Sequence, residues 1–376
     1  MQRPLDDAIA ERLAELEARG LRRSLLPLSE GEPGQRSLEG RSYLDFGSND
    51  YLGLGQAPVD WESLGRVGAG AQASRLVTGN VQAHREAEHR LAEYVRRDAA
   101  LLFTSGYATN VGTIPALVGP GDHIFSDALN HASLIDGCRL SRATVRVFAH
   151  NDLEDLRAKL AEAPSSGSRL IVTEAVFSME GDRAPLGPLA ELARDHGAWL
   201  MIDEAHSLGI LGPEGRGLCA ATGVEPEVLV VTLGKAFGAQ GAFVAGSERL
   251  RELLFHRARS LVFSTGISPL LATIVARRTA DVRQADAARA HQAQLCADLA
   301  AGLRAKGLEV RGEGPIVTAV FGDPAAATAC ELRLREVGIL ARAIRPPTVP
   351  EGTSRIRLVP TAAHRTEDLS RLLGAI

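Results

Sequence analysis

The chain has 376 residues, of which 45% are hydrophobic and 23% charged, so it resembles an ordinary globular protein with enough apolar residues for two or more domains. The formal net charge of −4 predicts no attraction to nucleic acid or to anionic membranes, and no apolar run reaches the ~18 residues of a membrane span. The first residues, Met-Gln-Arg-Pro-Leu-Asp-Asp, lack the apolar core of a signal peptide. The four cysteines are too far apart for CxxC pairs, which favours buried thiols in a reducing cytoplasm and neither a disulfide frame nor a metal site.

A helix is expected near the start of the chain, over residues 6–20, because Ile9, Leu13 and Leu16 recur at helical spacing. An arginine pair that includes Arg22 follows in an expected loop. From the residues alone, this pair could be a solvated helix end or part of a binding site.

The next segment contains a dinucleotide-like pattern that lacks its context. Residues 42–54 read as a strand that leads into a turn-rich stretch, and a helix is expected from about His84 to Arg97. Between them, Gly68–Ala73 matches GxGxxA. No buried strand precedes this match, so the βαβ unit of a dinucleotide site is missing and we assign it no role.

From about residue 98 the pattern is that of an α/β protein. Apolar strand-like runs lie at 100–103, 145–148, 169–173, 198–202, 228–231 and 242–245. Helix-like stretches lie at 106–118, 152–163, 187–196 and, after Pro269, over roughly 270–305. A smaller unit follows, with strands near 315–321 and 355–359 and helices near 325–337 and 364–375. The alternation predicts a mainly parallel sheet covered by helices.

Three units are therefore expected along the chain. They are an N-terminal helix and arm over 1–40, a large domain over 41–268 and a C-terminal small domain over 269–376.

Polar residues follow four of the predicted strands at the point where each strand ends. Thr104 to Tyr107 follow the first run, Glu174 and Ser178 the third, Asp203 to His206 the fourth, and Thr232 with Lys235 the fifth. Because ligands of parallel sheets bind beyond the carboxyl ends of the strands, these clusters are expected to converge on one ligand.

Lys235 lies in a Gly-rich turn directly after a buried strand. That environment favours a neutral amine, which can form a Schiff base with a carbonyl compound. A P-loop is excluded, because Leu229 and Ala236 occupy the positions where it needs Gly and Ser or Thr. The alternative is a lysine that holds a loop through a surface ion pair.

The residue types at the strand ends suit pyridoxal phosphate. Ser105, Gly106 and Tyr107 open a helix, and free N–H groups at a helix start bind phosphate. Asp203 ends an apolar strand and needs a cationic partner, which a protonated pyridine nitrogen would provide. His131 offers a flat ring for stacking. Each residue alone could equally be a helix cap or a structural histidine, but their combination is improbable by chance.

At these residues the chain resembles the α-oxoamine synthases, a family of fold-type I pyridoxal-phosphate enzymes, over roughly residues 20–365. The motifs are Phe46-Gly-Ser-Asn-Asp-Tyr-Leu-Gly53, Phe103-Thr-Ser-Gly-Tyr-Ala-Thr-Asn110, Asn130-His-Ala-Ser133, Glu174-Ala-Val-Phe-Ser-Met-Glu-Gly-Asp182, Asp203-Glu-Ala-His206 and Thr232-Leu-Gly-Lys-Ala-Phe-Gly238. The resemblance implies a large domain with a mainly parallel seven-stranded sheet, a smaller α/β C-terminal domain, and a homodimer with its site at the subunit interface.

The resemblance also implies a role for each site residue. Lys235, with His131 and Asp203, is implied to be catalytic, the lysine as the covalent anchor of the cofactor and then as the base. Implied cofactor-binding residues are Gly106, Tyr107, Ser178, Asp203, His206, Thr232 and Lys235. Implied substrate-binding residues are Arg22, Asn49, His131, Arg345, Thr348 and Arg357. Ser264 and Thr265 match only loosely the family segment that contacts the phosphate of the partner subunit.

The segment Ala343 to Leu358 is similar to that of family members that condense L-alanine with a pimeloyl thioester, carried by coenzyme A or acyl carrier protein, in biotin biosynthesis. It argues against the nearest alternative, the condensation of glycine with acetyl-CoA by the same fold. Two other classes stay open, a nicotinamide-dependent oxidoreductase that uses Gly68–Ala73 and a non-catalytic binding protein.

Overall fold

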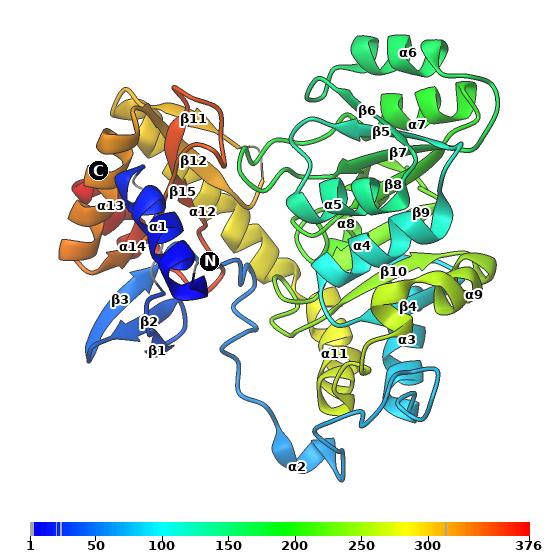
Figure 1. The fold of residues 1–376 in the computed structure, drawn as a ribbon. Helices are drawn as coiled ribbons and strands as arrows, with labels where there is room; N and C mark the ends of the chain where they lie inside the picture. Colours follow the sequence, from blue (N-terminus) through cyan, green and yellow to red (C-terminus); the bar gives the residue numbers. More distant parts are fainter. Residues whose placement is uncertain (1–3, 20, 23–24, 313) are drawn as a thin grey trace.

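The computed structural model describes residues 4–19, 21–22, 25–312 and 314–376. These residues form two lobes (Figure 1). The larger lobe is built on a seven-stranded sheet, and the smaller lobe combines the end of the chain with strands from near its start. The expected α/β class is confirmed.

The large sheet has the strand order β4-β10-β9-β8-β7-β5-β6, and β10 alone runs antiparallel to its neighbours. The strands are β4 (Ala99–Phe103), β5 (His123–Asp127), β6 (Thr144–Phe148), β7 (Arg169–Glu174), β8 (Trp199–Asp203), β9 (Val228–Thr232) and β10 (Ala242–Gly246). Six of them were expected from the sequence. The seventh, β5, is fully buried, but His123, Ser126 and Asp127 leave it only two adjacent apolar residues, which is too few for an apolar pattern.

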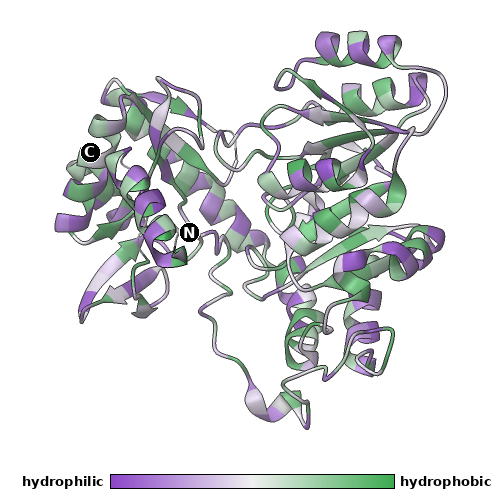
Figure 2. Cartoon of the chain, in the orientation of Figure 1, coloured by the Kyte–Doolittle hydropathy of each residue, from purple (hydrophilic) through white to green (hydrophobic). Residues whose placement is uncertain are grey.

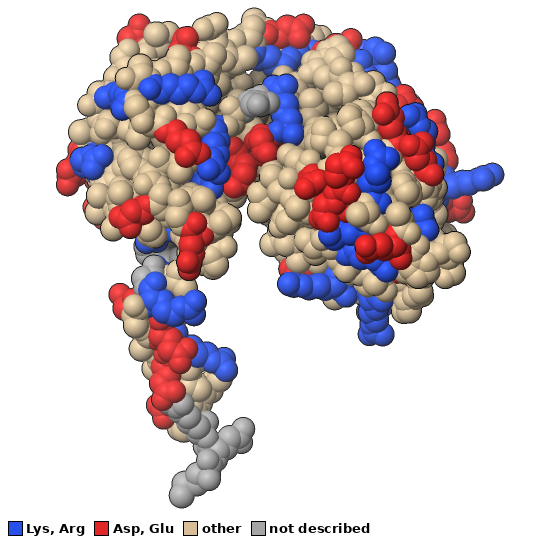
Figure 3. Space-filling model, turned by 90° about the horizontal axis from the view of Figure 1, so that it is seen from above, with Lys and Arg blue, Asp and Glu red and all other residues tan. Residues whose placement is uncertain are grey.

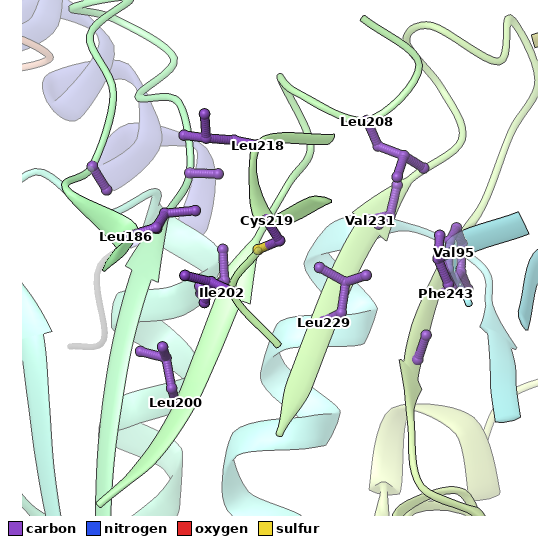
Figure 4. Packing of buried hydrophobic residues seen from close by; sticks show 14 of the residues in the cluster. Val95, Leu186, Leu200, Ile202, Leu208, Leu218, Cys219, Leu229, Val231 and Phe243 are labelled. Atoms are coloured by element: carbon purple, nitrogen blue, oxygen red, sulfur yellow. The ribbon is translucent and has the colours of Figure 1, made fainter. Parts of the chain in front are cut away.

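Helices cover both faces of this sheet. One face carries α3 (Gln82–Val95), α6 (Leu153–Glu162), α7 (Leu186–Asp195), α8 (Gly217–Thr222) and α11 (Pro269–Arg283), and the other carries α4 (Gly106–Leu117), α5 (Ala132–Ser141), α9 (Glu248–Arg257) and α10 (Arg259–Val262). Successive strand residues alternate between the two cores, as Leu101 and Leu102 do. Figure 4 shows part of the first core, with Leu200 and Ile202 of β8, Leu229 of the neighbouring β9 and Cys219 of α8. The central strands are accordingly the most uniformly apolar part of the lobe (Figure 2).

The smaller lobe contains two four-stranded sheets, in the orders β11-β12-β15-β14 and β1-β2-β3-β13. Its strands are β1 (Ser29–Glu30), β2 (Gln35–Leu38), β3 (Arg41–Asp45), β11 (Glu309–Arg311), β12 (Val317–Gly322), β13 (Ile339–Leu340), β14 (Arg342–Ile344) and β15 (Ser354–Leu358). Its helices are α12 (Asp286–Ala305), α13 (Pro324–Glu336) and α14 (Thr366–Ala375). The two sheets share one lobe because β3 pairs in parallel with β13.

The packing places the lobe boundaries differently from the expected 41 and 269. Leu44 and Phe46 lie in the core of the smaller lobe, because β3 pairs with a strand formed almost 300 residues later. Conversely, Ala272 and Val275 of α11 pack in the core of the large lobe, whereas Leu295 of α12 packs in that of the smaller lobe. We therefore propose that the large lobe spans 47–283 and that the smaller one combines 29–46 with 286–376. The helical region expected over 270–305 is thus two helices with different partners.

Helix α1 (Leu5–Ala18) has no buried residue. Its apolar stripe, including Ile9, Leu13 and Leu16, is partly exposed, and the helix projects from the body of the molecule (Figure 3). No helix among the described residues combines the length and apolar character needed to cross a bilayer.

Candidate active site

The predicted strand-end residues do meet at one edge of the large sheet. Strands β4, β7, β8 and β9 run in the same direction, so the segments that follow them leave from the same edge. Glu174 of β7 and Asp203 of β8 are direct cross-strand neighbours. Gly106 approaches Thr232 so closely that a Cβ at this glycine would lie 3.6 Å from the threonine Cβ. The four clusters therefore lie at one edge of the sheet, and their binding of a common ligand stays a prediction.

Lys235 is half-buried and is linked to two other polar side chains. Its Nζ lies 2.7 Å from His206 Nε2, and His206 Nδ1 lies 2.5 Å from the Tyr51 hydroxyl. Burial, followed by the charges of Lys235 and Arg357, lowers the pKa of His206 well below its usual value. The imidazole is thus neutral at pH 7, so that one ring nitrogen donates a hydrogen bond while the other accepts one.

The protonation equilibrium of the Lys235 amine is also shifted. Burial lowers the pKa of Lys235, while the carboxylates of Asp203 and Glu174 act in the opposite direction. Burial likewise raises the pKa of Glu174, and the charge of Asp203 adds to this effect. A lysine with a lowered pKa supplies the neutral amine that nucleophilic attack on a carbonyl requires.

Asp203 is buried and held by hydrogen bonds on both carboxylate oxygens. Asn110 Nδ2 donates to Oδ2 over 2.8 Å, and the Ala205 N–H donates to Oδ1 over 2.9 Å. The same Asn110 amide donates to Ser133 Oγ over 2.9 Å. Ser133 Oγ in turn lies 2.8 Å from His131 Nδ1. One network therefore orients both the buried carboxylate and the imidazole of His131.

His131 is the N-cap of helix α5 and is exposed. Its backbone N–H donates to Glu174 Oε1 over 2.6 Å, so the carboxylate fixes the start of the helix. Desolvation lowers the pKa of His131, and the charges of Asp203 and Lys235 shift it in opposite directions. These three groups therefore act on one another electrostatically. We call Tyr51, His206, Lys235, Asp203, Asn110 and His131 the lysine cluster.

Arg357, on β15, connects the smaller lobe to this edge. Its Nη2 donates to Asn49 Oδ1 over 2.9 Å and its Nε to the Ser178 carbonyl over 2.7 Å. Burial lowers its pKa. A buried guanidinium is suited to bind a carboxylate in a bidentate manner.

The start of α4 is as predicted, but the Tyr107 side chain is not in the cluster. Ser105 caps the helix by accepting a hydrogen bond from the Ala108 N–H over 3.1 Å. The Tyr107 ring is about half exposed, and its hydroxyl donates to Asp136 Oδ2 over 2.5 Å. Only the backbone at Gly106 and Tyr107 therefore remains suited to phosphate binding at this helix N-terminus.

Arg22, Arg345 and Thr348 lie together elsewhere, around a cavity of about 580 Å³. Residues of α13 and β14 complete its wall, including Glu331 and Arg342. We call this the arginine cavity. Arg23, the neighbour of Arg22 in the basic pair, lies outside the described residues. The same holds for Ser24 and for residues 1–3, 20 and 313.

Two members of the lysine cluster had no predicted role. Tyr51 and Asn110 both lie within the motifs quoted above, but nothing in the local pattern indicates that their side chains reach His206 and Asp203. The segment with Ser264 and Thr265, which matches the family only loosely, lies on the large lobe. There Thr265 forms an antiparallel β-bridge with Ser74.

Comparisons with known proteins agree with this geometry. Residues 41–376 match the family of class I and II aminotransferases. An 8-amino-7-oxononanoate synthase of Anaeromyxobacter dehalogenans is 46% identical over 383 aligned residues, covering 100% of this chain and 96% of that protein. The structure of a Sphingomonas wittichii serine palmitoyltransferase superposes with a TM-score of 0.91 at 33% identity, covering 98% of this chain and 95% of that one. A serine palmitoyltransferase of S. paucimobilis with a bound pyridoxal phosphate–myriocin aldimine superposes with a TM-score of 0.92 at 29% identity, covering 99% and 97%.

The chain therefore belongs to the class I and II aminotransferase family and has the fold-type I architecture of its pyridoxal-phosphate enzymes. Within that family it is an acyltransferase of the α-oxoamine synthase type, and its cofactor is pyridoxal 5′-phosphate.

The described residues fit this cofactor. Asn110 Oδ1 is a buried acceptor without a hydrogen-bond partner among them, next to an Asp203 carboxylate that faces the lysine cluster. At the start of α4, Gly106 has no side chain of its own and lies next to the side chain of Thr232. An amine, a buried carboxylate and a helix start are the three features that an aldehyde, a pyridinium and a phosphate require.

Proposed function

We propose that this protein catalyses the reaction of an 8-amino-7-oxononanoate synthase, in which L-alanine condenses with a pimeloyl thioester and CO₂ and the carrier thiol are released. One observation carries the proposal: the Lys235 amine, 2.7 Å from His206, lies at the same sheet edge as Asp203 in a chain that is 46% identical over its whole length to an enzyme of that name. The product is a precursor of biotin, and the carrier is coenzyme A or acyl carrier protein.

When bound, pyridoxal phosphate supplies an electron sink for the charge that develops when the α-proton of the amino acid leaves. Lys235 holds the cofactor and then removes that proton, for which its lowered pKa is suited. Asp203 would hold the pyridine nitrogen in its protonated form, and Asn110 fixes the carboxylate. His131 would stack on the ring, and its position is set by Ser133 and Glu174.

The remaining cofactor contacts would come from four segments. Ser178 and His206 would interact with the oxygen on the ring. Thr232 and the backbone of Gly106 and Tyr107 would hold the phosphate.

Asn49 and Arg357 bind the carboxylate of alanine. Their side chains already meet, with 2.9 Å between Arg357 Nη2 and Asn49 Oδ1, so an incoming carboxylate needs only a small rearrangement to pair with the guanidinium.

Arg22, Arg345 and Thr348 bind the acyl donor. A cavity of about 580 Å³ has room for an extended acyl chain. The carboxylate at the far end of a pimeloyl chain is a suitable partner for Arg22 or Arg345, whereas a short acetyl group has none. This is why the glycine and acetyl-CoA alternative is less favoured.

We also infer a cytoplasmic homodimer. The support is that all four cysteines are free thiols in buried positions, and that the large lobe leaves apolar side chains such as Val77 and Phe263 more than 70% exposed near the Ser74–Thr265 bridge. A partner subunit seated there would cover them. Sedimentation of the purified protein tests this, and a monomer at micromolar concentration would contradict it.

The proposed function is tested by a spectrum and a substrate panel. The purified protein should absorb in the near-visible range of the cofactor, and L-alanine should change that spectrum. Alanine, glycine and serine are then combined with acetyl, pimeloyl and palmitoyl thioesters. A clear preference for glycine with acetyl-CoA would disprove the substrate assignment while leaving the enzyme class intact.

A further inference from the structure

One loop of the large lobe reaches into the smaller lobe beside the lysine cluster. Residues 176–183 follow β7 and turn back on themselves: the Phe177 N–H donates to the Asp182 carbonyl over 3.0 Å, and the Gly181 N–H to the Phe177 carbonyl over 2.8 Å. We call this segment the 176–183 loop. It includes Ser178, to which the proposed function gives a contact with the cofactor.

Two arginines of β15 in the smaller lobe both donate hydrogen bonds to this loop. Arg355 and Arg357 are two residues apart in the strand and therefore lie on the same face of the sheet. Arg357 Nε donates to the Ser178 carbonyl over 2.7 Å. Arg355 Nη1 donates to Glu180 Oε1 over 2.8 Å and to the Met179 carbonyl over 3.2 Å. Three consecutive loop residues are thus bonded to one strand.

The Arg355–Glu180 pair is buried between the lobes. The Arg355 side chain is 0% exposed and that of Glu180 12%. A buried ion pair loses much of its attraction to desolvation and is a poor source of stability by itself, but breaking one partner is costly and the geometry of the pair is narrow. Such a pair is better suited to fixing a position than to adding stability.

At Gly181 the loop is in close contact with the smaller lobe. Gly181 adopts a φ of +74°, and a Cβ there would lie 2.8 Å from the Ile316 carbonyl oxygen and 2.9 Å from Gly312 Cα. The backbones of the two lobes are therefore in contact at this point. A shift of the loop would move Ser178 and the hydrogen-bonded Arg357 together.

We propose that the Arg355–Glu180 ion pair is a positioning device for the amino-acid site, which sets the strand that carries Arg357 against the loop that carries Ser178. The inference rests on the proposed function, in which Arg357 binds the carboxylate of the amino acid. Arg355 does not touch the substrate and acts through its neighbour in the strand. When the Arg355 guanidinium is removed, Arg357 keeps its hydrogen bond to the Ser178 carbonyl. The loop then loses the other two of its three hydrogen bonds to β15, those to the Met179 carbonyl and to Glu180.

The experiment measures the affinity of the holoenzyme for L-alanine from the change in cofactor absorbance. Arg355→Met is expected to raise the Kd about tenfold, since a displacement of the order of 1 Å is enough for a loss of this size. Glu180→Gln keeps a hydrogen-bond acceptor and should raise it less. Because both residues act through one contact, the double variant should be no worse than Arg355→Met alone. Effects that multiply in the double variant would overturn the proposal.

A matched control separates positioning from general destabilisation. Glu88 of α3 pairs with Arg75 inside the large lobe, and their side chains are 8% and 2% exposed, which is close to the burial of the proposed pair. Glu88→Gln should lower the thermal midpoint, as Arg355→Met does, without changing the Kd for alanine. If the Kd of the Arg355→Met enzyme rises no more than that of Glu88→Gln, the pair is merely structural and the proposal fails.

The same titration with glycine and L-serine distinguishes the two proposals. All three ligands share the carboxylate, so the positioning effect should appear with any amino acid that binds. A wild-type enzyme that responds to glycine or serine and not to alanine would contradict the proposed substrate, and the pair would then be tested with the ligand that binds. A wild-type enzyme that responds to none of the three would overturn both.

Discussion

The lysine cluster and the arginine cavity are built in opposite ways. In the cluster, Asp203 and His206 are buried, and each is held by hydrogen bonds to residues from other elements. In the cavity, Arg22 and Thr348 are exposed, and Arg22 forms an ion pair with Glu17 of the projecting helix α1, over 2.8 Å. The cluster is preorganised by the sheet, whereas the cavity places residues of an arm and a loop against α13 and β14. We expect chemistry to depend on the first region and donor selectivity on the second.

The sharpest test of the comparison is Lys235→Ala. Because the amine is both the anchor of the cofactor and the proposed base, its removal should lower kcat/KM by on the order of 10⁴ or more and abolish the absorbance band of the bound cofactor. Lys306→Ala, at the exposed end of α12, is the control and should retain activity. Full turnover in Lys235→Ala would remove the cluster from the mechanism.

Asp203→Asn should have the next largest effect. The substitution keeps the shape of the side chain but removes the charge that stabilises a protonated ring, so kcat should fall by about 10²-fold or more. Asparagine has one acceptor oxygen in place of two, so only one of the two donors, Asn110 Nδ2 or the Ala205 N–H, keeps its hydrogen bond, and a loss of stability of about 1–3 kcal/mol is expected beside the fall in kcat. Steady-state kinetics and circular dichroism are the measurements. A normal kcat would mean that the ring nitrogen has another partner.

Tyr51→Phe should have an intermediate effect. The change removes the hydroxyl that lies 2.5 Å from His206 Nδ1 and leaves a buried ring nitrogen unpaired. A loss of this kind is worth about 1–3 kcal/mol, and part of it should appear as a kcat lowered about tenfold. If only stability falls and kcat is unchanged, Tyr51 supports the fold and not the orientation of His206.

Arg345→Ala should act on the donor alone. Because the residue lines the cavity and not the cluster, we expect KM for the pimeloyl thioester to rise about tenfold while kcat and the Kd for alanine change little. Arg333→Ala, an exposed α13 position outside the cavity wall, is the matched control. A fall in kcat with an unchanged KM would contradict the division of labour between the two regions.

The smallest expected effect concerns the pH dependence of the stability of the large lobe. His150 lies between Asp127 and Asp182, 2.9 and 2.8 Å from their carboxylates. Burial lowers its pKa, but the hydrogen bonds and charges of these two residues outweigh burial and raise it to about 10. The folded pKa is thus above the unfolded one of ~6.5. The stabilisation is therefore fully present below about pH 6.5 and is lost as pH rises through about 10.

Thermal unfolding between pH 6 and pH 10 measures this contribution. The wild type should lose a few degrees more than His150→Gln over that range, since each kcal/mol corresponds to roughly 2–4 °C in a large domain. Parallel pH dependences of the two proteins would show that His150 is not charged in the folded state.

Residues whose position follows from a local pattern could be predicted from the sequence, whereas contacts between distant segments could not. The strand-end rule located Asp203 and Thr232 correctly, because buried parallel strands have continuous apolar runs and end where the polar residues begin. Strand β5 was not predicted, because three of its five residues are polar. The roles of Tyr51 and Asn110 depend on which distant segments meet, and local pattern carries no information about that.

The lobe boundaries illustrate a further limit. Periodicity indicated a helical region over 270–305, but which lobe each half joins depends on partners far away in the chain. Likewise, α1 was recognised by an apolar stripe that has no buried residue in the folded chain. An amphipathic pattern predicts a helix, and it does not say what the helix packs against.

The pairing of β3 with β13 has a consequence for biosynthesis. Strands from residues 29–45 leave the ribosome early, yet the neighbour that completes their sheet is encoded at 339–340. The intervening large lobe can fold first, as a self-contained insert, while the early strands remain open at one edge. A chain that stops short of residue 339 would thus present an unprotected strand edge to other nascent chains, so truncation there should lead to aggregation in addition to the loss of Arg357.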